Sequence, residues 1–208
     1  MIAVGAIDVG SPASGKLGWA ILTPDAATQT GRDLDEFITA MIATCAHWPA
    51  AIGFEAPMFV PVRARAVQVL TARRGEGSRP WSAGAGAAVT AAGLGVVTYT
   101  LAALRKGMTA SVATTRYADH PAKPGEVMFF EAFVSQADKG ADHADDALIA
   151  ARAMAAQFDG SAALASCLDE PEVFSLLGAA MLRTGWSTDL SELSRPCLVV
   201  RPLPKEIA

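Results

Sequence analysis

The chain has 208 residues, of which 51% are apolar and 18% are charged, and its formal net charge is −4 at pH 7. This composition excludes a disordered chain, and it argues against a strongly basic nucleic-acid-binding domain without excluding an enzyme that carries a local basic patch. The three cysteines, Cys45, Cys167 and Cys197, are far apart in the sequence. They indicate neither a disulfide framework nor a zinc knuckle, and they favour a reducing cytoplasm.

The first part of the chain predicts a strand hairpin, a helix and a further strand. The strands are short apolar runs that end at turn residues, and the helix has apolar side chains at helical spacing with acids in its first turn. The strands are expected at residues 2–9, 17–23 and 51–56, and the helix at residues 33–48. Residues 24–31 are too polar to assign, although they leave room for a short third strand.

The rest of the chain alternates between helices and strands. An aromatic and β-branched run at residues 127–134 gives the strongest strand signal of the chain. Helices are expected at residues 84–104, 142–157 and 172–183, and an edge strand at residues 197–200. This order predicts an α/β fold with a mixed sheet, in which residues 1–157 form one domain and residues 158–208 form a helix-and-strand extension packed on the same domain.

Residues 84–104 form an uncharged stretch that is long enough to cross a bilayer. Its composition is dominated by small residues and threonine, whereas the large apolar residues that drive membrane insertion are sparse. We therefore expect a close-packed interior helix, broken near Gly93 and Gly95, and no membrane partner.

Three acids occur at the end of, or within, the apolar strands: Asp8, Glu55 and Glu131. A lone carboxylate in a buried strand costs several kcal/mol unless it is paired or bound to a cation. Asp8 and Glu55 both lie where a strand gives way to a loop, which is where α/β proteins tend to place their sites. One cation site shared by the three acids is therefore a simpler explanation of their positions than a separate partner for each acid.

The expected helix at residues 142–157 begins with Asp142-His143-Ala144-Asp145-Asp146. Asp142 and Asp146 are four residues apart and Asp142 and Asp145 are three apart, so two carboxylates can face the sheet edge together. The simpler interpretation is a helix cap with acids that favour the helix dipole. Their occurrence together with the strand acids favours a site for Mg²⁺ or Mn²⁺, because hard oxygen ligands without cysteine suit these ions.

Three motifs surround these acids: Ala6-Ile7-Asp8-Val9-Gly10, Gly53-Phe54-Glu55-Ala56-Pro57 and His143-Ala144-Asp145-Asp146-Ala147-Leu148. They resemble the acidic motifs of the ribonuclease H-like nuclease superfamily, in particular the RuvC-type resolvases and a group of uncharacterised predicted nucleases. In the resolvases, an aspartate lies on the first strand and a glutamate closes the fourth strand. A last helix carries an acid or a histidine three residues before the aspartate of an Asp-Ala-Leu stretch.

The resemblance implies a mixed five-stranded sheet with helices on both faces and a nuclease that hydrolyses phosphodiester bonds with two metal ions. Two ions about 3.5–4 Å apart are the usual apparatus for that reaction. The implied catalytic residues are Asp8, Glu55 and Asp146, and the implied metal ligands are Asp8, Glu55, Asp142 and Asp146. Further residues that the resemblance adds to the site are Glu131, His143 and Asp145.

Residues 58–80 are rich in arginine and directly follow the strand that ends at Glu55. Arginines there are expected to bind the phosphates of a nucleic acid, DNA or RNA, and a tryptophan to stack on an unpaired base. The candidate nucleic-acid-binding residues are Arg63, Arg65, Arg73, Arg74, Arg79 and Trp81. A solvated helix face is the simpler interpretation of the same pattern.

Two alternatives come from other classes of protein. The turn at Asp8-Val9-Gly10 with Gly15-Lys16 also resembles the phosphate-binding first hairpin of actin-like ATPases and sugar kinases, although residues 11–16 lack the GxxxxGK[ST] pattern. The other alternative is a catalytically silent nuclease fold that binds partners or forms a homodimer through residues 84–104.

Overall fold

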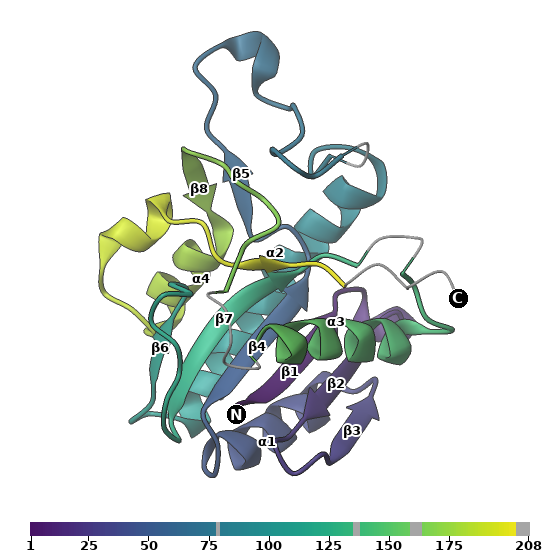
Figure 1. Cartoon of the computed structure of the whole chain (residues 1–208). Helices are drawn as coiled ribbons and strands as arrows, with labels where there is room; N and C mark the ends of the chain where they lie inside the picture. The colour runs from purple at the N-terminus through teal and green to yellow at the C-terminus, as the bar shows by residue number, and fades with distance from the viewer. Residues whose placement is uncertain (78–79, 135–137, 159–163, 203–208) are drawn as a thin grey trace.

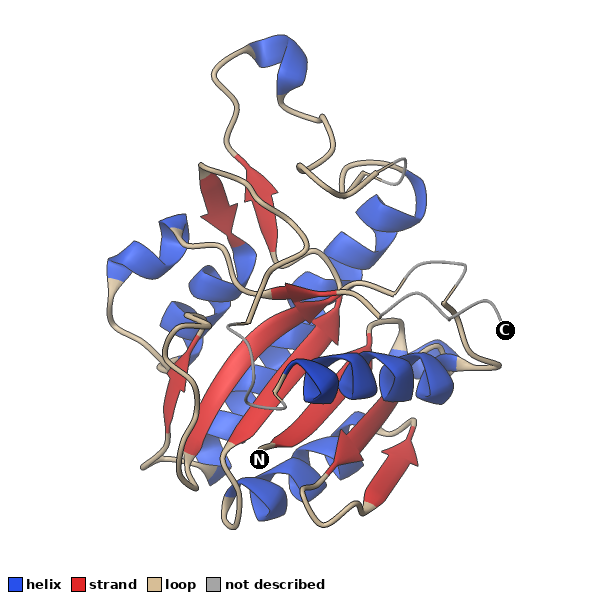
Figure 2. Ribbon diagram, in the orientation of Figure 1, coloured by secondary structure: helices blue, strands red, loops and turns tan. Residues whose placement is uncertain are grey.

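The computed structural model describes residues 1–77, 80–134, 138–158 and 164–202, which form a seven-stranded mixed sheet with helices on both faces (Figures 1 and 2). The strands of this sheet are β1 (Ala3–Asp8), β2 (Gly18–Leu22), β3 (Thr28–Gly31), β4 (Ala50–Glu55), β6 (Val112–Thr114), β7 (Glu126–Ala132) and β9 (Val199–Val200). The helices are α1 (Leu34–Cys45), α2 (Gly84–Gly107), α3 (His143–Gln157) and α4 (Leu176–Thr184). Two further strands, β5 (Phe59–Pro61) and β8 (Val173–Ser175), pair in a small separate sheet.

The large sheet has the strand order β3-β2-β1-β4-β7-β6, and β9 also pairs with β7. The first three strands form an antiparallel meander, whereas β4, β7, β6 and β9 join it in parallel. Parallel pairing requires a crossover between successive strands. Here α1 lies between β3 and β4, and α2 lies between β5 and β6, so the crossovers supply the helices that cover the sheet.

Alternation along the strands divides the apolar core into two layers. On β1, Val4 and Ala6 belong to the layer under α3, whereas Ala3 and Ile7 belong to the layer that contains α1, α2 and α4. Strands β4 and β7 alternate in the same way, because successive side chains of a strand point to opposite faces. An acid on one of these strands therefore faces either α3 or the opposite layer, according to its position in the alternation.

Helix α2 is continuous, so the expected break at its glycines is wrong. A Cβ atom at Gly93 would lie 3.0 Å from the Cβ atom of Ala56, and Gly93 therefore allows close packing rather than a bend. The description as an interior helix holds only for the side that packs on the sheet, since Leu94 and Tyr99 are half-exposed. Among the described residues, α2 is also the one helix whose length and composition would suit a membrane span.

Most other expected elements are confirmed, with two differences. A short third strand does occur, at β3, and the expected C-terminal edge strand is β9, which pairs with β7. The sheet has seven strands rather than five, because the short strand β6 and the two-residue β9 add to it. The last helix begins later than expected, because Val173–Ser175 pair with β5 and the Ser175 side chain then caps α4 by accepting a hydrogen bond from the backbone of Gly178.

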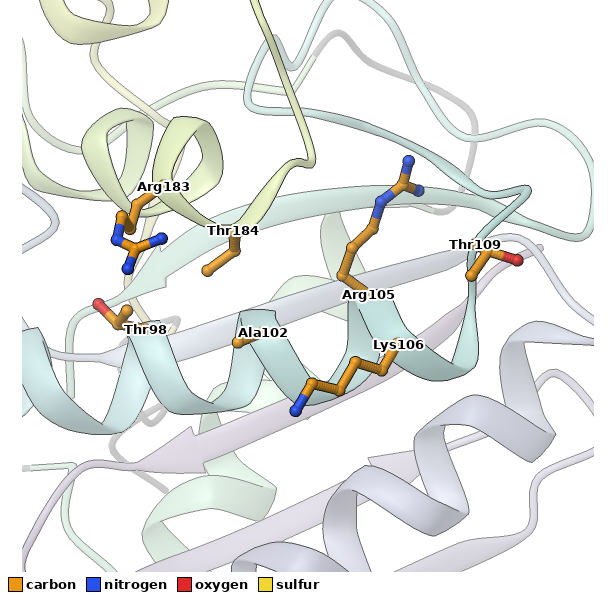
Figure 3. A pocket seen from close by; sticks show the side chains of 7 residues that line it. All are labelled: Thr98, Ala102, Arg105, Lys106, Thr109, Arg183 and Thr184. Carbon is orange, nitrogen blue, oxygen red and sulfur yellow. The ribbon is translucent and has the colours of Figure 1, made fainter.

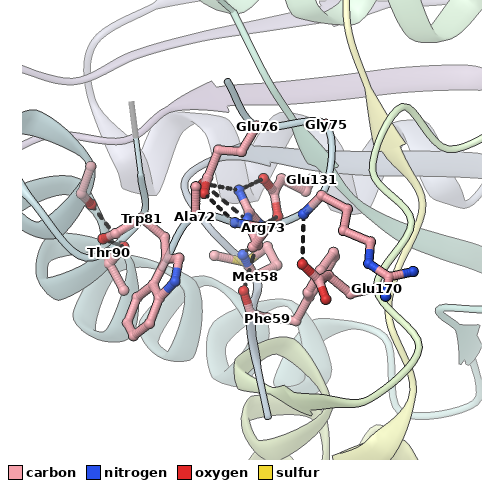
Figure 4. Close-up of polar contacts among 12 residues, drawn as sticks. Met58, Phe59, Ala72, Arg73, Gly75, Glu76, Trp81, Thr90, Glu131 and Glu170 are labelled. Atoms are coloured by element: carbon pink, nitrogen blue, oxygen red, sulfur yellow. Dashed lines mark hydrogen bonds and ion pairs between the residues drawn. The ribbon is translucent and has the colours of Figure 1, made fainter. Parts of the chain in front are cut away.

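A buried ion pair holds the base of a projecting arm, which we define as residues 62–72 (Figure 1). Arg73, where the arm returns, is fully buried and donates to both carboxylate oxygens of Glu131 at 2.7 Å (Figure 4). The same guanidinium also donates to Glu76 at 3.0 Å and lies 4.9 Å above the ring of Phe59. Glu131 accepts a further hydrogen bond from the backbone N–H of Met58 at 2.9 Å. One guanidinium therefore contacts both carboxylates of this buried cluster.

Replacing Arg73 by methionine leaves Glu131 and Glu76 buried without their cation, and we expect the free energy of unfolding to fall by about 3–5 kcal/mol. The matched control is Arg65→Met, which removes an exposed arginine of the arm and should change this free energy by less than about 0.5 kcal/mol. Urea denaturation followed by circular dichroism measures both. Equal stability of the two variants would contradict a structural role for the ion pair.

Candidate metal centre

Two acids meet at the carboxyl end of the central strands. Asp8 ends β1 and Glu55 ends β4, and the parallel register places these two residues side by side. Asp8 continues the series of Val4 and Ala6, whose side chains face α3, and Glu55 points to the same face because it is in register with Asp8. Both side chains are largely buried, with 8% of Asp8 and 14% of Glu55 exposed.

The N-terminus of α3 comes very close to the sheet over β2. Gly18 on β2 pairs with Asp8, and a Cβ atom at Gly18 would lie 2.1 Å from the carbonyl carbon of His143. A residue without a side chain is needed for the helix to approach this far. Asp142 caps the helix by accepting hydrogen bonds from two backbone N–H groups of its first turn, which fixes where the helix begins.

This close approach brings His143 and Asp146 over Asp8. Being three residues apart on α3, the two side chains share one face of the helix. The Nδ1 atom of His143 lies 2.5 Å from Oδ2 of Asp8, and one possible ligand atom from each of the three residues lies within 4.8 Å of the others. Two carboxylates and an imidazole are donors that a divalent metal ion accepts. Asp8, His143 and Asp146 are therefore the residues that could hold one.

Lys139 and Glu55 occupy the other side of this group. The Lys139 ammonium lies 2.9 Å from Oδ2 of Asp146 and 4.0 Å from Oε1 of Glu55. Burial, together with the negative charges of Asp8 and Asp146, raises the pKa of Glu55 to about 9 in spite of the lysine. Burial alone would lower the pKa of Lys139, but its hydrogen bond to Asp146 and the charge of Glu55 raise it. The single ammonium of Lys139 therefore does not offset the combined negative charge of Asp8, Glu55 and Asp146 when all three are ionised.

Two acids that were expected at the metal site from the sequence instead make contacts at the start of α3. Asp142 is exposed, caps α3 and forms an ion pair with Arg32 at 2.7 Å. Asp145 is also exposed and accepts a hydrogen bond from the backbone of Ala141 at 3.2 Å. The simpler interpretation of this part of the sequence, a capped helix start, is therefore correct for Asp142, which is not among the grouped ligands.

Glu131 faces away from the candidate metal centre. It is in register with Phe54, one residue before Glu55, and both belong to the face opposite α3. Its carboxylate is occupied by Arg73 and by the backbone of Met58 (Figure 4). Glu131 is thus a structural acid rather than a further ligand, and the strand alternation explains why.

The arginines of residues 58–80 are divided between structural and exposed positions. Arg73 is buried, and the guanidinium of Arg63 donates to both carboxylate oxygens of Glu170 at 2.7 and 2.9 Å, so neither is free to bind a phosphate. Arg65 and Arg74 are exposed. The expected contribution of Arg79 lies outside the described residues.

Trp81 is half-buried, and its indole N–H donates to the backbone carbonyl of Thr71 at 3.2 Å. The Thr90 side chain donates in turn to the Trp81 carbonyl at 3.2 Å (Figure 4). These contacts attach the end of the arm to the start of α2. Because these contacts fix the Trp81 side chain, only the exposed part of its ring is accessible to stack on a base.

The acids open into a cavity of about 690 Å³ at the carboxyl end of the sheet. Besides Asp8, Glu55 and His143, its lining includes Lys139 and Arg201, two cations that the sequence did not point to. The Arg201 guanidinium stacks 4.6 Å from the centre of the Phe133 ring. Lys139 precedes Asp142 by three residues, so its position next to the acidic cluster could have identified it as a site residue. No feature of the sequence could have identified Arg201, because only the pairing of β9 with β7 brings it to the site.

A second cavity, of about 470 Å³, lies between α2 and α4 (Figure 3). Cations and hydroxyl groups line it: Thr98, Arg105, Lys106, Thr109, Arg183 and Thr184. Basic side chains near the last turn of a helix offset the partial negative charge of the free carbonyl groups there. Arg105 does so directly, by donating to the carbonyl of the C-cap residue Met108 at 3.3 Å. The described lining has no carboxylate, so it lacks the acids that the first cavity offers.

Comparisons of the chain with protein-family models, with curated proteins and with solved structures found no match.

The close approach at Gly18 can be tested by Gly18→Ala. The added methyl group would overlap the backbone of α3, so we expect a loss of about 1–3 kcal/mol in the free energy of unfolding and weaker Mn²⁺ binding. Gly95→Ala is the matched control, because a Cβ atom there meets nothing within 4 Å and alanine favours the helix by about 0.5–1 kcal/mol. Unchanged Mn²⁺ affinity in a folded Gly18→Ala protein would contradict the packing described here.

The pKa of Glu55 predicts how stability depends on pH when no divalent ion is present. Its native pKa is about 9, above the ordinary 4.5, so between these values the folded protein holds a proton that the unfolded chain has lost. The free energy of unfolding should therefore fall as the pH rises from about 5 to about 9. Denaturation at several pH values should show a smaller fall for Glu55→Gln, and an equal fall in both proteins would rule out Glu55 as its source.

Proposed function

We propose that this chain is a divalent-metal-dependent nuclease of the ribonuclease H-like type. Three features support the proposal: an aspartate on the first strand, a glutamate that closes the fourth strand, and a histidine three residues before an aspartate on a later helix. These are Asp8, Glu55, His143 and Asp146. The meander of β1, β2 and β3 also agrees with the opening of that fold.

The observation that carries the proposal is the compact group of Asp8, His143 and Asp146, whose possible ligand atoms all lie within 4.8 Å of one another. Two of the three residues, Asp8 and Asp146, are buried, and the one ammonium of Lys139 does not offset the charges of both. The carboxylates suit Mg²⁺ and Mn²⁺ alike, whereas an imidazole ligand suits transition metals. We therefore favour Mn²⁺ over Mg²⁺ as the ion of this site.

Each residue then has a role in hydrolysis. A bound divalent ion lowers the pKa of water and offsets charge that develops on the phosphate. Asp8 and Asp146 would hold the ion, and the contact with Asp8 would orient the His143 ring. A nearby divalent ion would lower the raised pKa of Glu55, and the ionised Glu55 would then accept the proton of the attacking water. Lys139 offers a positive charge to the phosphate beside these acids.

A nucleic acid is the substrate that best matches the surroundings of the site. The cavity is open and partly lined by Lys139 and Arg201, and the exposed arginines Arg65 and Arg74 lie on or next to the arm that leaves the same end of the sheet. Such cations bind the phosphate backbone without reading its sequence. We place the reaction in a reducing cytoplasm, which suits three free cysteines.

The kinase-like alternative is less well supported. The cavity beside the first hairpin, which includes Gly10 and Ser11, is also lined by Asp33 and Asp35. Carboxylates at that position repel a phosphate group, whereas a phosphate site needs backbone N–H groups or cations. Every residue of the hairpin turn at 11–16 is exposed, so the turn does not enclose a nucleotide.

The proposal is tested by incubating the purified protein with labelled single strands, duplexes and branched junctions in Mn²⁺ or Mg²⁺. Asp8→Asn and Asp146→Asn should each reduce cleavage by about 100-fold or more, since each removes a charged ligand. Asp142→Asn is the control: asparagine also caps a helix, so this variant should cleave like the original protein. Cleavage that persists in EDTA, or that occurs on none of these substrates, would overturn the proposal.

A further inference from the structure

The acid group offers two distinct positions for a cation. The first is bounded by Asp8, His143 and Asp146. The second lies between Asp146 and Glu55, and the Lys139 ammonium occupies it, at 2.9 Å from the first carboxylate and 4.0 Å from the second. Asp146 borders both positions, which is the arrangement expected of a carboxylate shared by two neighbouring ions.

Lys139 is held at this position by the backbone around it. The N–H of Gly140 donates to Oδ1 of Asp146 at 2.7 Å, while the ammonium of Lys139 contacts the other oxygen of the same carboxylate. Gly140 packs so tightly that a Cβ atom there would lie 2.4 Å from Cβ of Asp145. A side chain at residue 140 would therefore displace the loop that carries Lys139, so the lysine is a built part of the site although 42% of its side chain is exposed.

The charges of the site also favour this arrangement. When ionised, Asp8, Glu55 and Asp146 contribute three negative charges, while Glu131 and Glu76, which also line the cavity, share the one positive charge of Arg73. One divalent ion and one ammonium neutralise three carboxylates. Two divalent ions together with Lys139 would leave an excess of two positive charges in a largely buried group, which is costly.

We propose that Lys139 takes the place of the second metal ion, so that the site binds one divalent ion and uses the lysine ammonium as its other cation. This inference rests on the proposed function, and it replaces the two-ion mechanism expected from the sequence. The ammonium then contacts a phosphate oxygen on the side of Glu55 while the metal ion lies on the side of His143. A lysine is a compact point charge on a flexible stem, so it fits this position better than an arginine does.

The test counts bound ions without any substrate. Titration with Mn²⁺ followed by electron paramagnetic resonance should give one ion per chain for the original protein. Lys139→Met empties the second position and keeps much of the side-chain volume, so this variant should bind two ions. Two ions about 3.5–4 Å apart couple magnetically, and the coupled spectrum should appear only in this variant. The control is Lys106→Met, which removes a lysine far along α2 and should still bind one ion.

The outcomes separate the inference from the proposed function. Two coupled ions in the original protein would overturn the inference and leave the nuclease proposal intact. A single ion in Lys139→Met would also overturn the inference, since the lysine would then not occupy an ion position. No bound Mn²⁺ in the original protein would overturn the metal centre itself and, with it, the proposed function.

Discussion

The repulsion between Asp8 and Glu55 is the constraint on which the candidate metal centre depends. The register of β1 and β4 places these acids side by side, and burial prevents water from screening them. Burial, and after it the charge of Asp8, raises the pKa of Glu55. Further groups lie beside these two acids: α3 supplies His143 and Asp146, and the loop before α3 supplies the positive charge of Lys139. This arrangement is possible only because Gly18 leaves room for the helix.

The two faces of the sheet treat a buried acid in different ways. Glu131 is in register with Phe54, one residue before Glu55, so it faces the opposite side of the sheet. There Arg73 binds both of its oxygens, and this ion pair is almost completely buried. A planar guanidinium with fixed donors suits a permanent structural contact. Lys139, in contrast, is partly exposed and lies nearer to Asp146 than to Glu55, whose Oε2 atom is buried without a hydrogen-bond partner among the described residues. Incomplete pairing distinguishes the acids of the candidate metal centre from those that stabilise the fold.

The sequence predicted the acids of the site better than it predicted their roles. Asp8, Glu55 and Asp146 could be found because a carboxylate beside an apolar run is costly wherever the run is buried. The sequence could not exclude Glu131, because both faces of β7 are apolar; the structure does so by placing Phe129, two residues before it, in the layer opposite α3. Likewise, the buried position of Arg73 could not be read from an arginine-rich segment, because it depends on a return of the chain to β7 that local pattern does not specify.

Strand β6 illustrates the same limit in the fold. Three residues with exposed or half-exposed side chains give no alternation to detect, and only pairing with β7 makes them a strand. Longer elements such as α1 and β7 carry their own signal, because one face of the helix and both faces of the strand are apolar. In this chain, the elements with a weak sequence pattern are thus the ones whose structure depends most on pairing with other elements.

The charge of the site also orders the events of the proposed reaction. A polyanion cannot enter a cavity lined by several acids at low cost, and the chain as a whole is negative. Neutralisation must therefore come first, from the divalent ion and Lys139, and it lowers the pKa of Glu55 at the same time because a nearby cation favours the ionised form. The ionised Glu55 is then able to accept a proton when the phosphate arrives. In the proposed reaction, the same cations thus prepare both the electrostatic environment and the base, and this gives a reason for keeping acids that repel one another together at this end of the sheet.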